Sequence, residues 1–171
     1  MIDGQAPDDT LMPPAPPARE ISSAHKPARC VLFLDNQRLT RDCLTEVITE
    51  QCPDLHVRGL RALDLEGQRP GADVALIILN LHDAPLSAAM QLVQRNPDHG
   101  AHPPLLVITN RDESAASIEA MQDAIAGLVR SDARVELLLA AIRLVMAGGR
   151  YYPADAIKSL MRKAPLIRTP G

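Results

Sequence analysis

Short runs of consecutive apolar residues recur along this chain, and segments with helical periodicity separate them. The clearest run is Val74–Leu79, which contains no polar residue before Asn80. A strand that is apolar on both faces is typical of a parallel sheet covered by helices on each side, whereas a sheet with one wet face alternates apolar and polar residues. The pattern therefore predicts an α/β fold.

Five strands and five helical segments are predicted in alternation. The predicted strands are Cys30–Leu34, Leu55–Leu60, Asp73–Leu81, Leu105–Ile108 and Ile125–Val129. The predicted helices are Arg38–Gln51, Leu63–Arg69, Leu86–Gln94, Glu113–Asp123 and Arg134–Ala147, the last stopping at Gly148-Gly149. This order favours one doubly wound, five-stranded parallel sheet with the flavodoxin-like strand order 2-1-3-4-5.

The two ends of the chain differ in composition from this central part. Residues 1–28 contain six prolines and few large apolar side chains. Such a segment cannot bury enough surface to offset its ordering entropy, so a disordered Pro-rich tail is predicted there. Residues 29–150 form the predicted domain, and residues 151–171 are expected to be a linker or short helix, with helical spacing over Ala154–Lys163.

Composition excludes several classes of function. The net charge of −3 and the pI of about 5.9 argue against a phosphate-backbone binder, and the 2% aromatic content argues against base-stacking platforms. No stretch has the length and apolarity of a membrane span, so a cytoplasmic protein without membrane contact is expected. The odd number of cysteines, without metal-ligand spacing, predicts reduced and mostly buried thiols: Cys30, Cys43 and Cys52.

The chemistry of a doubly wound sheet lies at the carboxyl ends of its strands, near the switch point between the first and third strands. Here those strands end in Asp35-Asn36 and Asn80. A carboxylate at the end of the third strand could act as a nucleophile. An amide has no anionic oxygen and does not titrate near neutral pH, so Asn80 cannot.

These residues resemble a known family. The stretch Val31–Leu39 looks like the opening of a two-component receiver domain, Leu79-Asn80-Leu81 falls where that family has its phosphoacceptor strand, and Ile108-Thr109 falls at its switch Thr or Ser. The segments after Gly127, and above all Ala147–Pro153, resemble the end of the receivers of LuxR-type transcription factors. The resemblance covers about residues 29–153.

The departures from that family concern the phosphorylation pocket. The resemblance implies two acids after the first strand, a phosphoacceptor Asp, a switch Thr or Ser and a Lys after the fifth strand. This chain has Asp35, Asn36, Asn80, Thr109 and Ser131 at those positions. Arg130, one position before Ser131, is a partial substitute for the Lys if the register shifts by one. The pocket is thus a degenerate one, with no metal or cofactor expected.

Three losses at one sheet edge predict that aspartyl phosphorylation does not occur: the nucleophile, two of three carboxylates for Mg²⁺ and the cation that offsets phosphate charge. Asn36 and Asn80 are expected to hydrogen-bond to each other or to Asp35. Asp83 is interpreted as a turn or cap residue. His82 is interpreted as an exposed loop histidine.

Three functional readings remain open. The first is a non-enzymatic, phosphorylation-independent pseudo-receiver that acts by contact with other regulatory proteins and as a homodimer. Its candidate dimer helix carries Val135, Leu138, Leu139, Ile142 and Leu144. The second is the receiver half of a DNA-binding LuxR-type regulator whose helix-turn-helix lies beyond this chain. The third is a ligand-binding or enzymatic domain around Asp35, Asn80 and Thr109, which lacks a Gly-rich phosphate loop.

Overall fold

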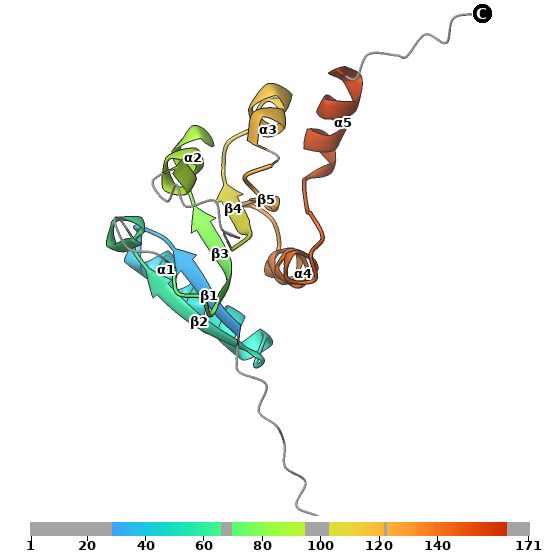
Figure 1. The fold of residues 1–171 in the computed structure, drawn as a ribbon. Coiled ribbons are helices and arrows are strands. Elements are labelled where there is room, and N and C mark those ends of the chain that lie inside the picture. The colour runs from blue at the N-terminus through green and yellow to red at the C-terminus, as the bar shows by residue number, and fades with distance from the viewer. Residues whose placement is uncertain (1–28, 66–69, 95–102, 122, 164–171) are drawn as a thin grey trace, which may run out of the picture.

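A five-stranded parallel sheet forms the centre of the molecule, as the computed structural model shows for residues 29–65, 70–94, 103–121 and 123–163 (Figure 1). Its strands are β1 (Arg29–Leu34), β2 (Leu55–Leu60), β3 (Val74–Asn80), β4 (Leu105–Thr109) and β5 (Gly127–Arg130). They pair in the order β2-β1-β3-β4-β5, with every pair parallel. The predicted fold class and strand order are confirmed.

Helical segments follow the strands in the predicted alternation. They are α1 (Arg38–Gln51), the 3₁₀ segment η1 (Ala62–Leu65), α2 (Ser87–Gln94), α3 (Ala115–Met121), α4 (Val135–Met146) and α5 (Ala154–Lys163). The one predicted helix that differs in kind is Leu63–Arg69, where the structure has η1 and residues 66–69 lie outside the described part. The Asp64 carboxylate accepts the Arg61 backbone N–H at 3.2 Å, which caps this short turn.

Helices cover both faces of the sheet, because alternate residues of each strand point to opposite sides. Val31 and Phe33 of β1 pack with Ile48 of α1 and with α4. Leu32 and Leu34 point the other way, into the core formed with α2 and α3. Of the three cysteines, Cys30 and Cys52 are buried and Cys43 is exposed, all as free thiols.

Gly148 ends α4, as its position in the sequence predicts. Its φ of +86° lies in the left-handed region that glycine adopts without a Cβ clash. The Gly148 N–H donates to the Val145 carbonyl and the Gly149 N–H to the Leu144 carbonyl, both at 2.9 Å. This pair of bonds is a Schellman motif, which satisfies the last carbonyls of the helix and turns the chain back toward the sheet.

The segment after α4 packs on the domain. Tyr151 forms an isolated β-bridge with Gly127, the first residue of β5. The two backbones approach closely, since a Cβ on Gly127 would lie 3.0 Å from the Tyr151 carbonyl oxygen. The Tyr152 hydroxyl donates to the Ile125 carbonyl at 2.8 Å, and α5 then lies against α3 (Figure 1). The predicted tail over residues 1–28 lies outside the described residues. Among the described helices, none has the length and apolarity needed to cross a bilayer.

The candidate dimer helix needs correction. Leu138, Leu139 and Ile142 of α4 are buried against the sheet, with exposures of 6%, 6% and 0%. They belong to the core of the domain because α4 turns this side toward β3 and β5, so they are not available to a second molecule. Val135 and Leu144 remain exposed, at 37% and 43%, and Leu137 joins them at 39%.

Candidate functional site

Neighbouring strands bring Asp35 and Asn80 together at the carboxyl edge of the sheet. Asp35 directly follows β1, and Asn80 is the last residue of β3, which pairs with β1. The Asn80 Nδ2 group donates a hydrogen bond to Asp35 Oδ2 at 2.8 Å. Both side chains are buried, with exposures of 1% for Asp35 and 8% for Asn80. Because an ionised carboxylate only accepts, the Asn80 amide must present its NH₂ group to Asp35.

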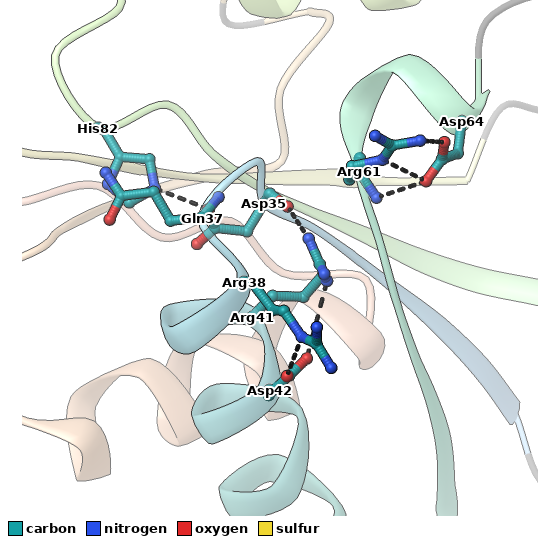
Figure 2. A network of polar contacts seen from close by, with 8 residues as sticks. All are labelled: Asp35, Gln37, Arg38, Arg41, Asp42, Arg61, Asp64 and His82. Atoms are coloured by element: carbon teal, nitrogen blue, oxygen red, sulfur yellow. Dashed lines mark hydrogen bonds and ion pairs between the residues drawn. The ribbon is translucent and has the colours of Figure 1, made fainter.

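The other oxygen of Asp35 has two further partners. Oδ1 accepts the backbone N–H of Gln37 at 2.7 Å, and His82 Nε2 lies 2.7 Å from the same oxygen (Figure 2). The histidine therefore carries its proton on Nε2 when it bonds to the carboxylate. Gln37 is the N-cap residue of α1, so this acid also fixes the start of the helix. The buried carboxylate is satisfied by three donors, one at the start of α1 and two at the end of β3 and in the turn after it.

His82 does not lie in the exposed position predicted for it. Its backbone adopts a φ of 50°, in the left-handed region, and its N–H donates to Asn80 Oδ1 at 3.3 Å. This turn directs the ring back over Asp35, where the His82 side chain is 27% exposed. Histidine tolerates this region better than β-branched residues do. In the sequence, the only indication that His82 reaches Asp35 is its position two residues after a strand end, and this indication is weak.

Asn36 does not join this cluster. It is exposed, and its Oδ1 accepts the backbone N–H of Ala62 at 3.2 Å, which ties the end of β1 to the start of η1. The expected hydrogen bond between Asn80 and Asp35 is present, whereas the expected contact of Asn36 with either residue is absent. The chain turns into α1 at this point, so the two consecutive side chains point to different neighbours.

Thr109 and Ser131 lie at the adjacent strand ends. Thr109 is fully buried, and its hydroxyl accepts the Arg111 backbone N–H at 3.1 Å. The Thr109 carbonyl accepts the Ser131 N–H at 2.9 Å, and the Ser131 side chain is exposed. The structure thus places the hydroxyl of Thr109 in a local turn, away from the bonds that surround Asp35.

Arg130, the potential substitute for the missing Lys, binds other acids. Its guanidinium pairs with Asp132 at 3.3 Å and with Asp112. Hydrogen bonding to Asp132, together with the charges of both acids, raises the pKa of Arg130 and keeps it charged. Asp83, also at this edge, accepts a hydrogen bond from the Asn110 amide and is exposed, in keeping with a turn residue.

Receivers hold Mg²⁺ at this edge, and the side chains here do not fit that ion. Mg²⁺ requires oxygen ligands that include carboxylates. Both oxygens of Asp35 accept bonds from protein donors, Asn80 turns its NH₂ toward the acid, and the Asn36 oxygen binds Ala62. Across the described residues, no three His, Cys, Asp or Glu side chains gather as a metal site would need.

Comparison with known proteins finds similar structures but no match in sequence. No protein-family model matches the chain, and no curated protein matches it in sequence. A LuxR family DNA-binding response regulator from Silicibacter pomeroyi superposes with a TM-score of 0.58 at 20% identity, over 74% of this chain and 98% of that one. The apo isolated REC domain of RcsB from Salmonella enterica serovar Typhimurium gives 0.64 at 19%, over 79% and 99%.

A third similar structure is a complex with DNA. The two-component response regulator RcsB–DNA complex superposes with a TM-score of 0.62 at 18% identity, over 78% of this chain and 68% of that one. Identities of this size establish the fold alone. The chain accordingly has the flavodoxin-like receiver fold, with a polar cluster of Asp35, Asn80 and His82 at the edge where receivers carry their phosphorylation site.

Proposed function

We propose that this chain is a non-enzymatic, response-regulator-like protein that acts through protein–protein contact and without phosphorylation of its receiver pocket. The observation that carries the proposal is the 2.8 Å hydrogen bond from Asn80 Nδ2 to Asp35 Oδ2. At the position of the phosphoacceptor the chain presents an amide NH₂ group, which donates a hydrogen bond to a neighbouring acid, and an amide has no anionic oxygen to attack phosphorus.

The charge balance of the pocket supports the same proposal. Three acids at one sheet edge repel each other when no metal is bound, and this repulsion raises their pKa values and costs stability. Here a single buried acid meets three donors: Asn80, Gln37 and His82. The pocket is satisfied by protein groups, so its conformation is set by packing and does not wait for a phosphoryl group.

Intact-mass spectrometry tests this directly. The chain is incubated with Mg²⁺ and a small phosphodonor, beside a phosphorylatable receiver as the positive control. We expect no adduct of about 80 Da on this chain, the mass of one phosphoryl group. An adduct on the wild type that disappears in Asn80→Ala, or in Asp83→Asn at the exposed carboxylate three residues after Asn80, would refute the proposal.

For the contact surface we propose a homodimer through the exposed side of α4. Leu137 and Leu144 are 39% and 43% exposed, although both are large and apolar. They lie seven residues apart and therefore on one side of the helix, with the exposed Ala140 between them. Glu136 and Arg143, also seven residues apart, flank this apolar stripe on one side.

The exposed side of α4 is complementary to the same side of a second copy when the two helices run antiparallel. When two copies of α4 pack antiparallel about a two-fold axis at Ala140, Leu137 of one copy faces Leu144 of the other, and Glu136 faces Arg143. The small side chain at the axis permits close approach of the helices. An isologous pair of this kind repeats each contact twice, which is the usual construction of a symmetric dimer.

Sedimentation of the full chain tests the dimer. We expect Leu144→Glu to be monomeric at concentrations where the wild type is a dimer. Glu136→Arg and Arg143→Glu should each weaken the dimer, and the double reversal should restore it, because both charges change sign together. A monomeric wild type, or a double reversal as weak as either single variant, contradicts the proposed interface.

A second candidate function is the receiver half of a DNA-binding LuxR-type regulator. The match to the RcsB–DNA complex, which spans 68% of that chain, favours it. DNA contact would then come from a helix-turn-helix encoded beyond Gly171. The discriminating observation is whether the reading frame continues there with a further helical pattern. Regulation by contact through the receiver is compatible with either outcome.

A further inference from the structure

A cavity of about 260 Å³ lies between α1 and α4, over the carboxyl ends of β3, β4 and β5. Its floor is apolar and buried: Ile108, Val129 and Leu138 are 4%, 2% and 6% exposed. Asn80, Thr40 and Ser131 supply polar groups to its wall. Concave sites with apolar walls and a few convergent polar groups, at the carboxyl edge of an α/β sheet, are where small ligands bind.

Ser131 explains part of the open space. It occupies the position where the resembling receivers carry a lysine, and it lines the cavity. Its side chain has three heavy atoms fewer than that of lysine and ends in a hydroxyl instead of an ammonium group. Arg130 also borders the cavity, but its guanidinium binds Asp112 and Asp132. The space is therefore not filled by a long side chain of this edge.

The charges around the cavity are already paired within the protein. The Arg130 guanidinium binds two carboxylates, and both oxygens of the buried Asp35 accept protein donors. A charged ligand would lose hydration without meeting an uncompensated counter-charge, which is costly in an apolar site. An uncharged ligand loses little and can exchange hydrogen bonds with the Thr40 and Ser131 hydroxyls, which donate and accept.

We propose that this cavity binds a small uncharged molecule with an apolar body and one hydrogen-bonding head group. The body lies on Ile108, Val129 and Leu138, and the head group faces Thr40, Asn80 and Ser131. The volume exceeds the roughly 150 Å³ that accommodates benzene and falls below the roughly 300–1,000 Å³ of drug-sized sites, so the ligand has about the size of a substituted single ring. This site goes beyond the proposed function and does not depend on it.

Three probes of nearly equal size separate the head-group charges: benzamide is neutral, benzoate is an anion and benzylamine is a cation near neutral pH. Each is titrated into the isotopically labelled full chain and followed by NMR. We expect saturable shifts with benzamide at the Ile108 and Val129 methyl groups, with affinity at least about tenfold higher than for either charged probe. No saturable shift with benzamide, or tighter binding of a charged probe, would overturn the proposal.

Two variants locate the binding. Val135 lines the cavity and is 37% exposed, whereas Ile157 of α5, which is 43% exposed, is not among the lining residues. Val135→Phe should fill the cavity and weaken benzamide binding about tenfold, and Ile157→Phe should leave it unchanged. Ser131→Met is a second filling variant at an exposed position. Binding that survives both filling variants refutes this location, and the phosphodonor experiment is unaffected by that result.

Discussion

Two polar clusters lie at the carboxyl edge of the sheet. Both contain acidic side chains, but the acid of one cluster is buried and the acids of the other are exposed. One consists of Asp35, Asn80 and His82, in which the acid is 1% exposed. The other consists of Arg130, Asp112 and Asp132, in which the two acidic side chains are 94% and 74% exposed. In the first cluster the acid meets an amide and an imidazole, and in the second the acids meet a guanidinium.

From this difference we expect burial, more than formal charge, to decide how much a polar contact contributes to the free energy of unfolding. The exposed ion pairs compete with water and salt, so they contribute little although both partners are charged. The buried acid has no access to water, so each lost partner leaves a donor or acceptor unsatisfied in the protein interior. We therefore expect the effect of substitution to follow burial, in decreasing order from Asp35 to Arg130.

The largest effect is expected for Asp35→Ala. The substitution removes the acceptor of Asn80 Nδ2, of the Gln37 N–H and of His82, and leaves buried donors without partners. We expect a loss of about 3 kcal/mol in the free energy of unfolding, measured by urea denaturation. Asp132→Ala, at the exposed acid, is the matched control and should give no resolvable change. Equal effects of the two substitutions would contradict the comparison.

The next largest loss of stability is expected for Asn80→Asp, and the size of this loss should depend on pH. It sets a second carboxylate at hydrogen-bond distance from Asp35, and the repulsion raises the folded-state pKa of the substituted acid above its unfolded value. With a raised folded pKa, the variant keeps its stability below the unfolded pKa of about 3.9 and loses it as the pH rises through the folded pKa. Near pH 8 we expect it to be about 2 kcal/mol less stable than the wild type.

Asn80→Ala separates repulsion from the loss of the hydrogen bond. It removes the same bond to Asp35 and introduces no acid, so its difference from the wild type should stay nearly constant between pH 4 and 8. Urea denaturation at several pH values measures both variants. If Asn80→Asp shows no more pH dependence than Asn80→Ala, position 80 is not adjacent to the buried acid in solution.

The backbone of this edge was predictable from sequence because burial leaves a strong local pattern. The apolar run of β3 ends at Asn80, and α1 has the predicted bounds Arg38–Gln51. A strand buried on both faces is uniformly apolar, and its end is marked where that run stops. The pairing of β1 with β3 then follows from the strand order, and with it the proximity of Asp35 and Asn80.

Side-chain directions beyond the strand ends were not predictable in the same way. The ring of His82 contacts Asp35 only because its backbone adopts a φ of 50°, a conformation that the sequence of the turn does not specify. Asn36 binds Ala62, a residue 26 positions away that arrives through the packing of η1. The sequence also does not show that Leu138, Leu139 and Ile142 lie in the core, because an apolar helix does not reveal how wide its buried side is.

His82→Asn is expected to have an intermediate effect, since the His82 side chain is 27% exposed. Asparagine is one of the residues that adopt the left-handed region most readily, so the turn is retained. Its shorter side chain removes the imidazole from Asp35 Oδ1, while the Gln37 N–H remains bonded to that oxygen. We expect a loss of about 1 kcal/mol in the free energy of unfolding. Unchanged stability would mean that the ring leaves the acid in solution.

The smallest effect on stability is expected for Arg130→Met, although the charge of the residue is lost. Hydrogen bonding and charge from Arg130 hold the pKa of Asp132 below its ordinary value. An acid with a depressed folded pKa contributes stability above its unfolded pKa, and this contribution is lost as the pH falls through the folded pKa. In the variant the pKa of Asp132 should rise toward the ordinary value, while stability at pH 7 shows no resolvable change because solvent screens the pair.

An NMR titration of the Asp132 carboxyl carbon between pH 2 and 7 measures that shift. Arg111→Met is the matched control, because the Arg111 guanidinium donates to the Asp83 carbonyl, whereas the pKa of Asp132 is lowered by Arg130. It should leave the Asp132 titration unchanged. A large loss of stability in Arg130→Met would show that this exposed cluster holds the sheet edge as firmly as the buried one, and burial would no longer account for the difference between them.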